Sequence, residues 1–162
     1  MFYKVFATAA GRVGILGSEA GLRRATLPQR SEEAALGLLG GDAKRTGPVP
    51  PYVDDLIENY RAYFSGRRVD FTCDLDFNGA TPFQQRVWRA ARLIPYGETR
   101  SYKWVAARAG NEDAARAVGQ ALGKNPLPII IPCHRVLAAD GGPGGFTGGL
   151  EMKRRLLKLE SV

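Results

Sequence analysis

Alternating and helical patterns of apolar residues predict a series of short elements in the first part of the chain. Three strand-like runs are separated by glycine-containing breaks typical of hairpins: residues 2–9, 12–18 and 21–27. A helical pattern follows over residues 31–39, with Ser31 as its N-cap. Residues 46–51 are rich in proline and predict a stiff loop, and residues 52–66 place apolar side chains at helical spacing.

Residues 70–77 alternate strictly between apolar and polar side chains, which predicts a half-buried strand. Its apolar face would carry Phe71, Cys73, Leu75 and Phe77. A small apolar side chain on a buried face is the simplest role for Cys73, and we prefer it to a reactive role. The turn-forming pair Asn78-Gly79 ends this pattern. We expect a domain boundary there, with one domain over residues 1–79 and a second over residues 80–162.

Helical patterns dominate the second half of the chain. Thr81, Pro82 and Gln84 have the types and spacing of a capping box with proline at the first helical position. The helix that they begin has a buried stripe made of Phe83, Val87, Ala90, Ala91 and Ile94. Residues 94–99 then predict a turn.

Two shorter helices are predicted over residues 101–110 and 111–124, joined at a glycine. Ser101 and Asn111 can cap them, and the arrangement is typical of a helix-turn-helix. The second helix consists mostly of small residues around the single long charged side chain of Arg116. Such a helix can approach another surface closely with its arginine protruding, or it can pack inside the protein with the arginine reaching water. The pattern alone leaves both interpretations open.

Charge is distributed unevenly along the chain. The net charge is +7, yet residues 1–79 are neutral, with ten basic and ten acidic side chains. Residues 80–162 contain thirteen basic and six acidic side chains and therefore hold the whole excess. This asymmetry indicates a polyanionic partner, most often nucleic acid, although solubility alone would also explain it.

The composition narrows the class of protein. An apolar fraction of 44% and a charged fraction of 24% over 162 residues are typical of a soluble globular chain with one domain or two small ones. We expect no signal peptide, because no basic region followed by a long apolar stretch opens the sequence, and no membrane span, because no apolar stretch is long enough. Two cysteines and one histidine indicate a reducing cytoplasm without a disulfide framework, and they are too few for a zinc site with four Cys and His ligands.

The strongest candidate for chemistry is the adjacent pair Cys133 and His134. Residues 129–131 predict a short buried strand ending at Pro132, after which both side chains could turn toward one cavity. An imidazole can deprotonate a thiol, and a carboxylate can orient the imidazole. From this dipeptide alone, a buried unreactive cysteine beside a hydrogen-bonded histidine is the simpler interpretation.

Two features that follow the pair favour a functional site. Residues 138–149 contain six glycines, which would let backbone N–H groups approach a ligand closely. Residues 150–160 predict a basic amphipathic helix that ends at Glu160, where the helix dipole disfavours a negative charge. Glu160 should therefore have a partner, for which His134 is the candidate; the alternative is a solvated terminal glutamate.

Six motifs in this order closely resemble the O6-alkylguanine-DNA alkyltransferases, also called methylated-DNA–protein-cysteine methyltransferases: TPFQQRVW, IPYGETRSY, ARAVGQAL, NPLPIIIPCHRV, GGFTGG and KRRLLKLE. The resemblance is strong over residues 80–162, whereas residues 1–79 match only in general layout. It implies an α/β N-terminal domain with a ribonuclease H-like small sheet plus helices. For the residues that follow, the resemblance implies a mainly α C-terminal domain with a winged-helix-like helix-turn-helix.

The resemblance also implies a reaction. The alkyl group of O6-alkylguanine in DNA would pass irreversibly and stoichiometrically to Cys133, with O4-alkylthymine as a further candidate substrate. His134, acting through a water and oriented by Glu160, would deprotonate the thiol. Tyr102 would donate a hydrogen bond or proton to the departing guanine, and Asn125 would brace the turn before the active-site strand. Each molecule would react once, without a metal or organic cofactor.

On the DNA side, the resemblance implies that Arg116 enters the base stack when the damaged nucleotide is flipped out. The small residues around it would let the helix approach the minor groove of alkylated double-stranded DNA: Ala114, Ala115, Ala117 and Gly119. The base pocket would be lined by Val136, Phe146, Thr147 and Gly148. Many members have tyrosine where this chain has Phe146, so the aromatic packing is kept and the hydroxyl is lost. We expect a cytoplasmic monomer with no membrane partner.

Two other functional classes compete with this one. A Cys-His-Glu hydrolase would turn over many times through a transient acyl-enzyme. A non-catalytic DNA-binding module would bind lesions and leave Cys133 unmodified. The basic second half and the single-arginine helix fit the DNA-binding module better than the hydrolase, and the presence of Cys133 disfavours the non-catalytic class.

Overall fold

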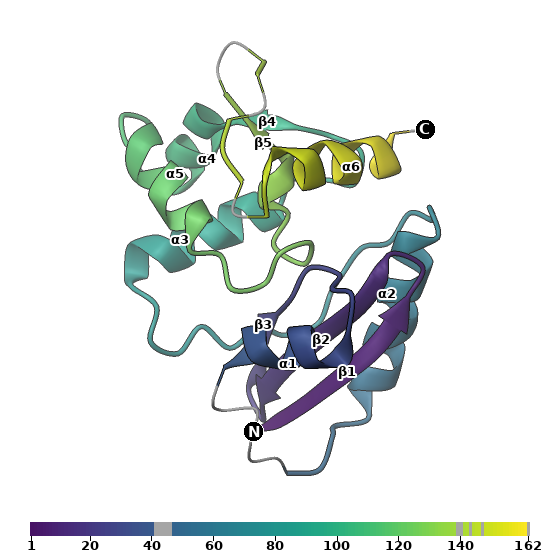
Figure 1. Cartoon of the computed structure of the whole chain (residues 1–162). Coiled ribbons are helices and arrows are strands. Elements are labelled where there is room, and N and C mark those ends of the chain that lie inside the picture. Colours follow the sequence, from purple (N-terminus) through teal and green to yellow (C-terminus); the bar gives the residue numbers. More distant parts are fainter. Residues whose placement is uncertain (41–46, 139–140, 143, 147, 162) are drawn as a thin grey trace. The chain divides into compact units, whose positions relative to one another are not determined.

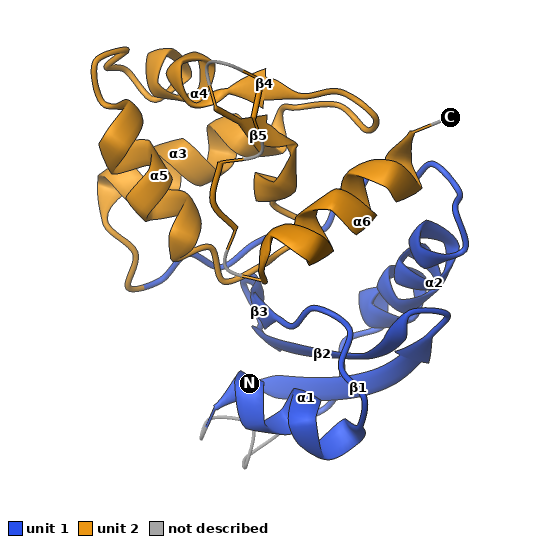
Figure 2. Cartoon of the chain, turned by 45° about the horizontal axis from the view of Figure 1, so that its top comes forward, with its two compact units in different colours: residues 1–78 blue, residues 79–162 orange. Residues whose placement is uncertain are grey.

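The computed structural model describes residues 1–40, 47–138, 141–142, 144–146 and 148–161 (Figure 1). The chain divides into two compact units, Met1–Asn78 and Gly79–Val162, which Figure 2 distinguishes by colour. Both units are small and combine short strands with helices. Among the described residues, none of the helices has the length and apolar character needed to cross a bilayer.

The first unit contains an antiparallel sheet with the strand order β1-β2-β3. The strands are β1 (Phe2–Thr8), β2 (Gly11–Ser18) and β3 (Gly21–Ala25), and they correspond to the three predicted strand-like runs. Five consecutive residues of β2 are buried, from Val13 to Gly17, because both faces of the sheet are covered.

Two helices provide that cover. Helix α1 (Glu32–Leu39) packs on β2 and begins at the predicted N-cap, where the Ser31 hydroxyl accepts the backbone N–H of Ala34 at 3.1 Å. Helix α2 (Tyr52–Phe64) packs on β1, where the rings of Phe6 and Tyr60 lie 5.4 Å apart.

The predicted strand over residues 70–77 is wrong. This segment is extended but forms a single bridge, between Leu75 and Leu22. Its two backbone hydrogen bonds to Leu22 are made by Asp74 and Asp76. Alternating apolar and polar residues indicate that one face of an extended segment is buried. A segment with a single bridge can bury one face as well as a strand in a sheet can. Cys73 is half-buried in this segment.

The second unit begins with helix α3 (Pro82–Arg92). The predicted capping box is confirmed, because the Thr81 hydroxyl accepts the N–H of Gln84 at 3.1 Å and the Gln84 side chain accepts the N–H of Thr81 at 3.0 Å. On the buried face, the indole N–H of Trp88 donates to the carbonyl of Ala121 at 2.9 Å. This bond connects α3 to the helix over residues Ala115–Gly123.

Helices α4 (Tyr102–Arg108) and α5 (Ala115–Gly123) pack against α3 and against each other, as Figure 1 shows. Ser101 caps α4 as predicted, with its hydroxyl accepting the N–H of Trp104 at 3.0 Å. The predicted cap at Asn111 is wrong. Its side chain accepts the N–H of Asp113 within a separate turn, and α5 begins only at Ala115, without a side-chain cap. A four-residue segment with asparagine first satisfies its own backbone locally, so the helix starts later.

The remaining elements close the unit around the candidate site. Strand β4 (Arg100–Ser101) pairs in parallel with β5 (Val136–Leu137). The last helix, α6 (Leu150–Glu160), contacts the short 3-10 turn η2 (Cys133–Arg135). The candidate nucleophile therefore lies between the C-terminal helix and the α4–α5 pair.

Candidate functional site

A proline-rich turn, and not the predicted buried strand, leads into Cys133. Residues 129 and 130 form a turn closed by a bridge between Pro128 and Ile131, and Ile129 adopts a φ of +77°. A left-handed conformation is strained for a β-branched residue, so the surrounding structure must impose it. Proline residues on both sides lack the N–H groups that a strand ladder needs, which explains why the apolar run does not extend.

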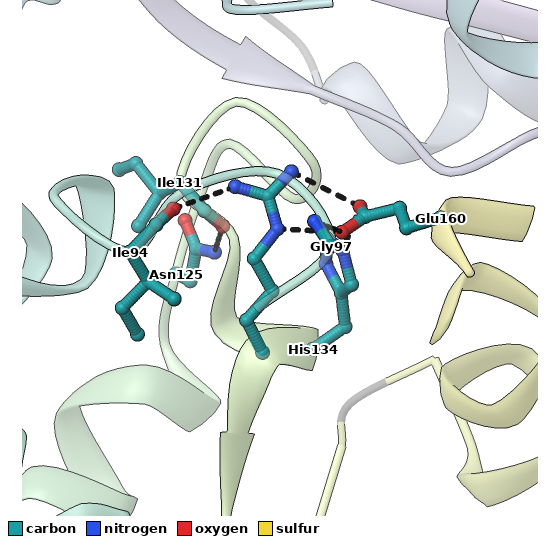
Figure 3. A network of polar contacts seen from close by, with 7 residues as sticks. Ile94, Gly97, Asn125, Ile131, His134 and Glu160 are labelled. Carbon is teal, nitrogen blue, oxygen red and sulfur yellow. Dashed lines mark hydrogen bonds and ion pairs between the residues drawn. The ribbon is translucent and has the colours of Figure 1, made fainter. Parts of the chain in front are cut away.

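Asn125 organises this turn (Figure 3). Its amide nitrogen donates to the carbonyl of Ile131 at 2.9 Å and to the sulfur of Cys133 at 3.2 Å. Its amide oxygen accepts the N–H of Leu127 at 2.9 Å. The side chain thus spans the turn and reaches the thiol itself.

The thiol of Cys133 opens onto a cavity of about 360 Å³. The cavity is lined by Tyr102, Gly119, Leu122, Gly123, Cys133, Gly145 and Phe146. Its volume is that of a small-ligand site, and Cys133 itself is 8% exposed. A ligand in this cavity would therefore meet residues that include the candidate nucleophile and two aromatic side chains.

His134 and Glu160 form a fully buried pair behind the cysteine, with relative exposures of 0% and 1%. The Nε2 of His134 and the Oε2 of Glu160 are 2.5 Å apart. The other ring nitrogen, Nδ1, is buried and has no hydrogen-bond partner among the described residues. Burial lowers the pKa of His134, and the nearby Glu160 only partly opposes this effect. The imidazole is therefore neutral, with Nε2–H donated to the carboxylate and Nδ1 available as a base.

Arg135 completes the surroundings of Glu160 and was not anticipated from the sequence. Its Nε donates to Oε1 at 2.7 Å and its Nη2 donates to Oε2 at 3.1 Å, so the guanidinium and carboxylate form a two-pronged ion pair. The third nitrogen donates to the carbonyl of Ile94 at 2.8 Å, and the backbone N–H of Gly97 also approaches Oε1 at 3.3 Å. Figure 3 shows this network around Glu160.

Lys153 is a second buried cation that sequence reasoning missed, with 0% exposure. Its ammonium group donates to the carbonyls of Val136 at 2.7 Å and Gly145 at 3.2 Å, and so joins β5 to the glycine-rich loop. Its position could have been found, because Lys153 lies three residues before Leu156 and seven before Glu160 on the same face of α6. Both of those residues are buried.

The charge of Lys153 affects the thiol. Burial raises the pKa of Cys133, whereas the hydrogen bond from Asn125 and the charge of Lys153 lower it. Burial also lowers the pKa of Lys153, and the charge of a Cys133 thiolate opposes that shift. The resting cysteine is therefore a thiol that needs a base, and the site already contains donors and charge that favour the thiolate once the proton leaves.

Tyr102 is the first residue of α4 and lines the cavity next to the glycine-rich loop. A Cβ atom at Gly144 would lie 2.6 Å from the Tyr102 hydroxyl, so this loop position requires glycine for the tyrosine to keep its place. Of the predicted pocket residues, Phe146 lines the cavity. Val136 does not line it; it is buried, and its carbonyl accepts from Lys153. Gly148 is exposed, and Thr147 lies outside the described residues.

Helix α5 has one buried face and one exposed face. Val118, Ala121 and Leu122 are buried, whereas Arg116 and Ala117 are exposed. The three remaining small residues are half-buried: Ala114, Ala115 and Gly119. Arg116 has no ion pair or hydrogen bond to other described residues, so its guanidinium is available to a partner.

A thiol, a neutral imidazole and a buried carboxylate near a ligand-sized cavity are the groups that proteins with a cysteine nucleophile use. Comparison with known proteins narrows this class. Residues 82–162 match the family described as 6-O-methylguanine DNA methyltransferase, DNA binding domain. A methylated-DNA–protein-cysteine methyltransferase from Methanosarcina acetivorans is 38% identical over 99% of this chain and 98% of its own length. The enzyme of that name from Mycobacterium bovis is 50% identical over 70% of this chain and 68% of its own length.

Solved structures agree with this result. The crystal structure of Mycobacterium tuberculosis OGT in complex with DNA has a TM-score of 0.79 and 40% sequence identity, and the match covers 99% of this chain and 92% of that one. This chain belongs to the methylated-DNA–protein-cysteine methyltransferase family.

Proposed function

We propose that this protein repairs DNA by transferring the alkyl group of O6-alkylguanine to the sulfur of its own Cys133. The observation that carries the proposal is the position of the thiol. It opens onto a ligand-sized cavity on one side and is followed in the chain by a buried histidine whose Nδ1 has no partner among the described residues. Family membership supports the same reaction.

His134 acts as the general base in this proposal. Because Glu160 accepts the Nε2–H, the lone pair of the imidazole lies on Nδ1, and the Cys133 proton passes to it directly or through one water. Deprotonation then gives a thiolate that Asn125 and Lys153 stabilise. In this proposal, deprotonation of Cys133 requires neither a metal nor an organic cofactor.

The chemical step is a displacement at the alkyl carbon. The sulfur–carbon bond forms as the bond between that carbon and guanine O6 breaks, and the electron pair of the broken bond goes to the base. Tyr102, which lines the same cavity, donates a hydrogen bond or a proton to the departing guanine. The product is a thioether that no nearby group can cleave, so each molecule reacts once. O4-alkylthymine is a further candidate substrate.

Access to the O6 substituent requires the damaged base to leave the DNA stack, which costs a few kcal/mol. The exposed guanidinium of Arg116 is suited to fill the vacated space, and the small residues of α5 allow a close approach to the minor groove. The flipped base would lie against Phe146, with Val136, Thr147 and Gly148 as the remaining pocket residues. In this proposal α4 and α5 form the helix-turn-helix of a winged-helix-like domain. The unit before them is a ribonuclease H-like domain, and the protein acts as a cytoplasmic monomer.

The test is the intact mass of the protein after incubation with excess oligonucleotide containing O6-methylguanine. The wild type should gain one methyl group in place of one hydrogen, and Cys133→Ser should gain none. Cys73→Ser is the matched control, because it removes the other cysteine and should react like the wild type. Repeated turnover with release of a free product would instead support a hydrolase. Tight lesion binding without any mass gain would support a non-catalytic DNA-binding protein.

A further inference from the structure

Arg135 holds three separate parts of the second unit together. It lies next to His134 in η2, it is 7% exposed, and its guanidinium reaches the carboxylate on α6 and a carbonyl at the end of α3. We propose that Arg135 is a positioning residue for alkyl transfer, which fixes the Glu160 carboxylate and through it the tautomer of His134. This inference rests on the proposed function for its kinetic consequences, whereas its structural claim can be tested without any reaction.

The geometry of the ion pair supports a positioning role. All three guanidinium nitrogens donate, two of them to different oxygens of Glu160 and the third to the carbonyl of Ile94. The guanidinium also lies over the ring of Tyr96, with its central carbon 5.7 Å from the ring centroid. A planar fork held at these points keeps the carboxylate plane in one orientation, which a flexible single-point ammonium would not do.

That orientation decides which nitrogen of His134 carries the proton. Glu160 Oε2 faces Nε2, and an ionised carboxylate can only accept, so the proton must lie on Nε2. The cation beside Glu160 keeps the carboxylate ionised in a buried site. If this cation were absent, the carboxylate could rotate or bind a proton, and Nδ1 would no longer be held as the acceptor toward Cys133.

The charge of Arg135 also helps to keep the imidazole of His134 neutral. The charged groups around the imidazole are Glu160 and Lys153 from α6, Arg135 from its own turn, and the neighbouring thiol of Cys133. The positive charges of Arg135 and Lys153 lower the pKa of His134 further, beyond the larger effect of burial. Removal of the arginine should therefore raise the pKa of the imidazole and protonate the base at a higher pH.

Arg135 also connects the His134–Glu160 pair to the segment that carries Tyr102, the proposed donor to guanine. Ile94, Tyr96 and Gly97 belong to the turn between α3 and β4, and all three contact Arg135 or Glu160. Strand β4 follows this turn after Gly97, and Tyr102 begins α4 directly after β4. A fixed turn therefore places Tyr102 relative to the pair that activates Cys133.

The chain contains a single histidine, which allows a direct test. Histidine labelled with ¹⁵N would be incorporated into the wild type, Arg135→Met and Arg135→Lys, with the exposed Arg154→Met as the matched control. In the wild type and the control we expect the Nε2–H tautomer across the neutral range. In Arg135→Met we expect a mixed tautomer or an imidazolium that forms at higher pH. Arg135→Lys keeps the charge without the fork, so its titration should stay close to that of the wild type while the tautomers mix.

Single-turnover kinetics complete the test. The rate constant describes the folded molecules alone and does not depend on how much of the variant is folded. A positioned base supplies about 10²–10⁴-fold, so Arg135→Met should slow methyl transfer by about 10–100-fold and Arg135→Lys by less. The pH at which the rate of methyl transfer rises should move upward only in Arg135→Met.

An unchanged tautomer and titration in Arg135→Met, with a rate constant within about twofold of the wild type, would overturn the inference. If Arg135→Met does not fold, the same comparison in Arg135→Lys decides: unmixed tautomers there overturn it. A wild type that shows the expected tautomer but transfers no alkyl group would refute the proposed function and leave the structural claim standing.

Discussion

Replacement of Glu160 by glutamine tests the central claim that a buried carboxylate anchors the site. The substitution keeps the shape of the side chain and removes its charge. The carboxylate accepts from His134, from two nitrogens of Arg135 and from the N–H of Gly97, and it is 1% exposed. An amide could accept with one oxygen only, and its NH₂ group would face donors.

The expected loss follows from the charge that remains. Arg135 would be left in a site where it is 7% exposed, without its counter-ion. Breaking a buried pair by removing one partner costs about 3–5 kcal/mol, against a total domain stability of about 5–15 kcal/mol. We therefore expect Glu160→Gln to lower the free energy of unfolding of the second unit by about 3 kcal/mol or more. The folded fraction should transfer methyl groups about 10²–10⁴-fold more slowly, because Nδ1 is no longer fixed as the base.

Urea unfolding followed by tryptophan fluorescence measures this loss selectively. Both tryptophans of the chain, Trp88 and Trp104, lie in the second unit. Glu151→Gln is the matched control, because Glu151 lies on the same helix and is exposed. The control should change the free energy of unfolding by less than about 0.5 kcal/mol. A loss below about 1 kcal/mol in Glu160→Gln would fall within the range of an exposed ion pair and refute the claim of a buried anchor.

Three further predictions concern the thiol, the DNA-facing arginine and the histidine. Lys153→Met should raise the pKa of Cys133, so the pH dependence of thiol alkylation by iodoacetamide should move to higher pH; an unchanged profile would contradict the role of the lysine charge. Arg116→Ala should slow reaction with duplex DNA by about tenfold or more, since flipping costs a few kcal/mol, and should leave reaction with the free base O6-benzylguanine within about twofold; equal losses would exclude a role in base flipping. Because burial lowers the pKa of His134 below its ordinary 6.5, the unfolded chain binds the extra proton, and stability should fall as the pH decreases below 6.5, by up to about 1.4 kcal/mol per pH unit. In His134→Gln this part of the slope, measured by urea unfolding at several pH values, should disappear.

Local signals in the sequence were reliable where the chain satisfies its own backbone nearby. The capping box at Thr81 and the caps at Ser31 and Ser101 formed as predicted, because each requires only residues within one helical turn. The predicted helix start at Asn111 and the predicted strand at Ile129 are both wrong, for a related reason. In both cases a competing turn, made by an asparagine side chain or by flanking prolines, satisfied the backbone before the predicted helix or strand could begin.

Residue types and spacing were enough to identify the groups available for chemistry. They also pointed from Glu160 to His134, because a negative charge at the end of a helix needs a partner. The electrostatics of the site, in contrast, depend on how distant segments pack. Arg135 and Lys153 are charged residues that a pattern assigns to the surface, yet both are buried, because a carboxylate and backbone carbonyls from distant segments satisfy them. The cost of burying a charge depends on partners that are far away in the chain. For that reason the reactivity of Cys133 becomes visible only when α6, η2 and the turn after α3 have come together.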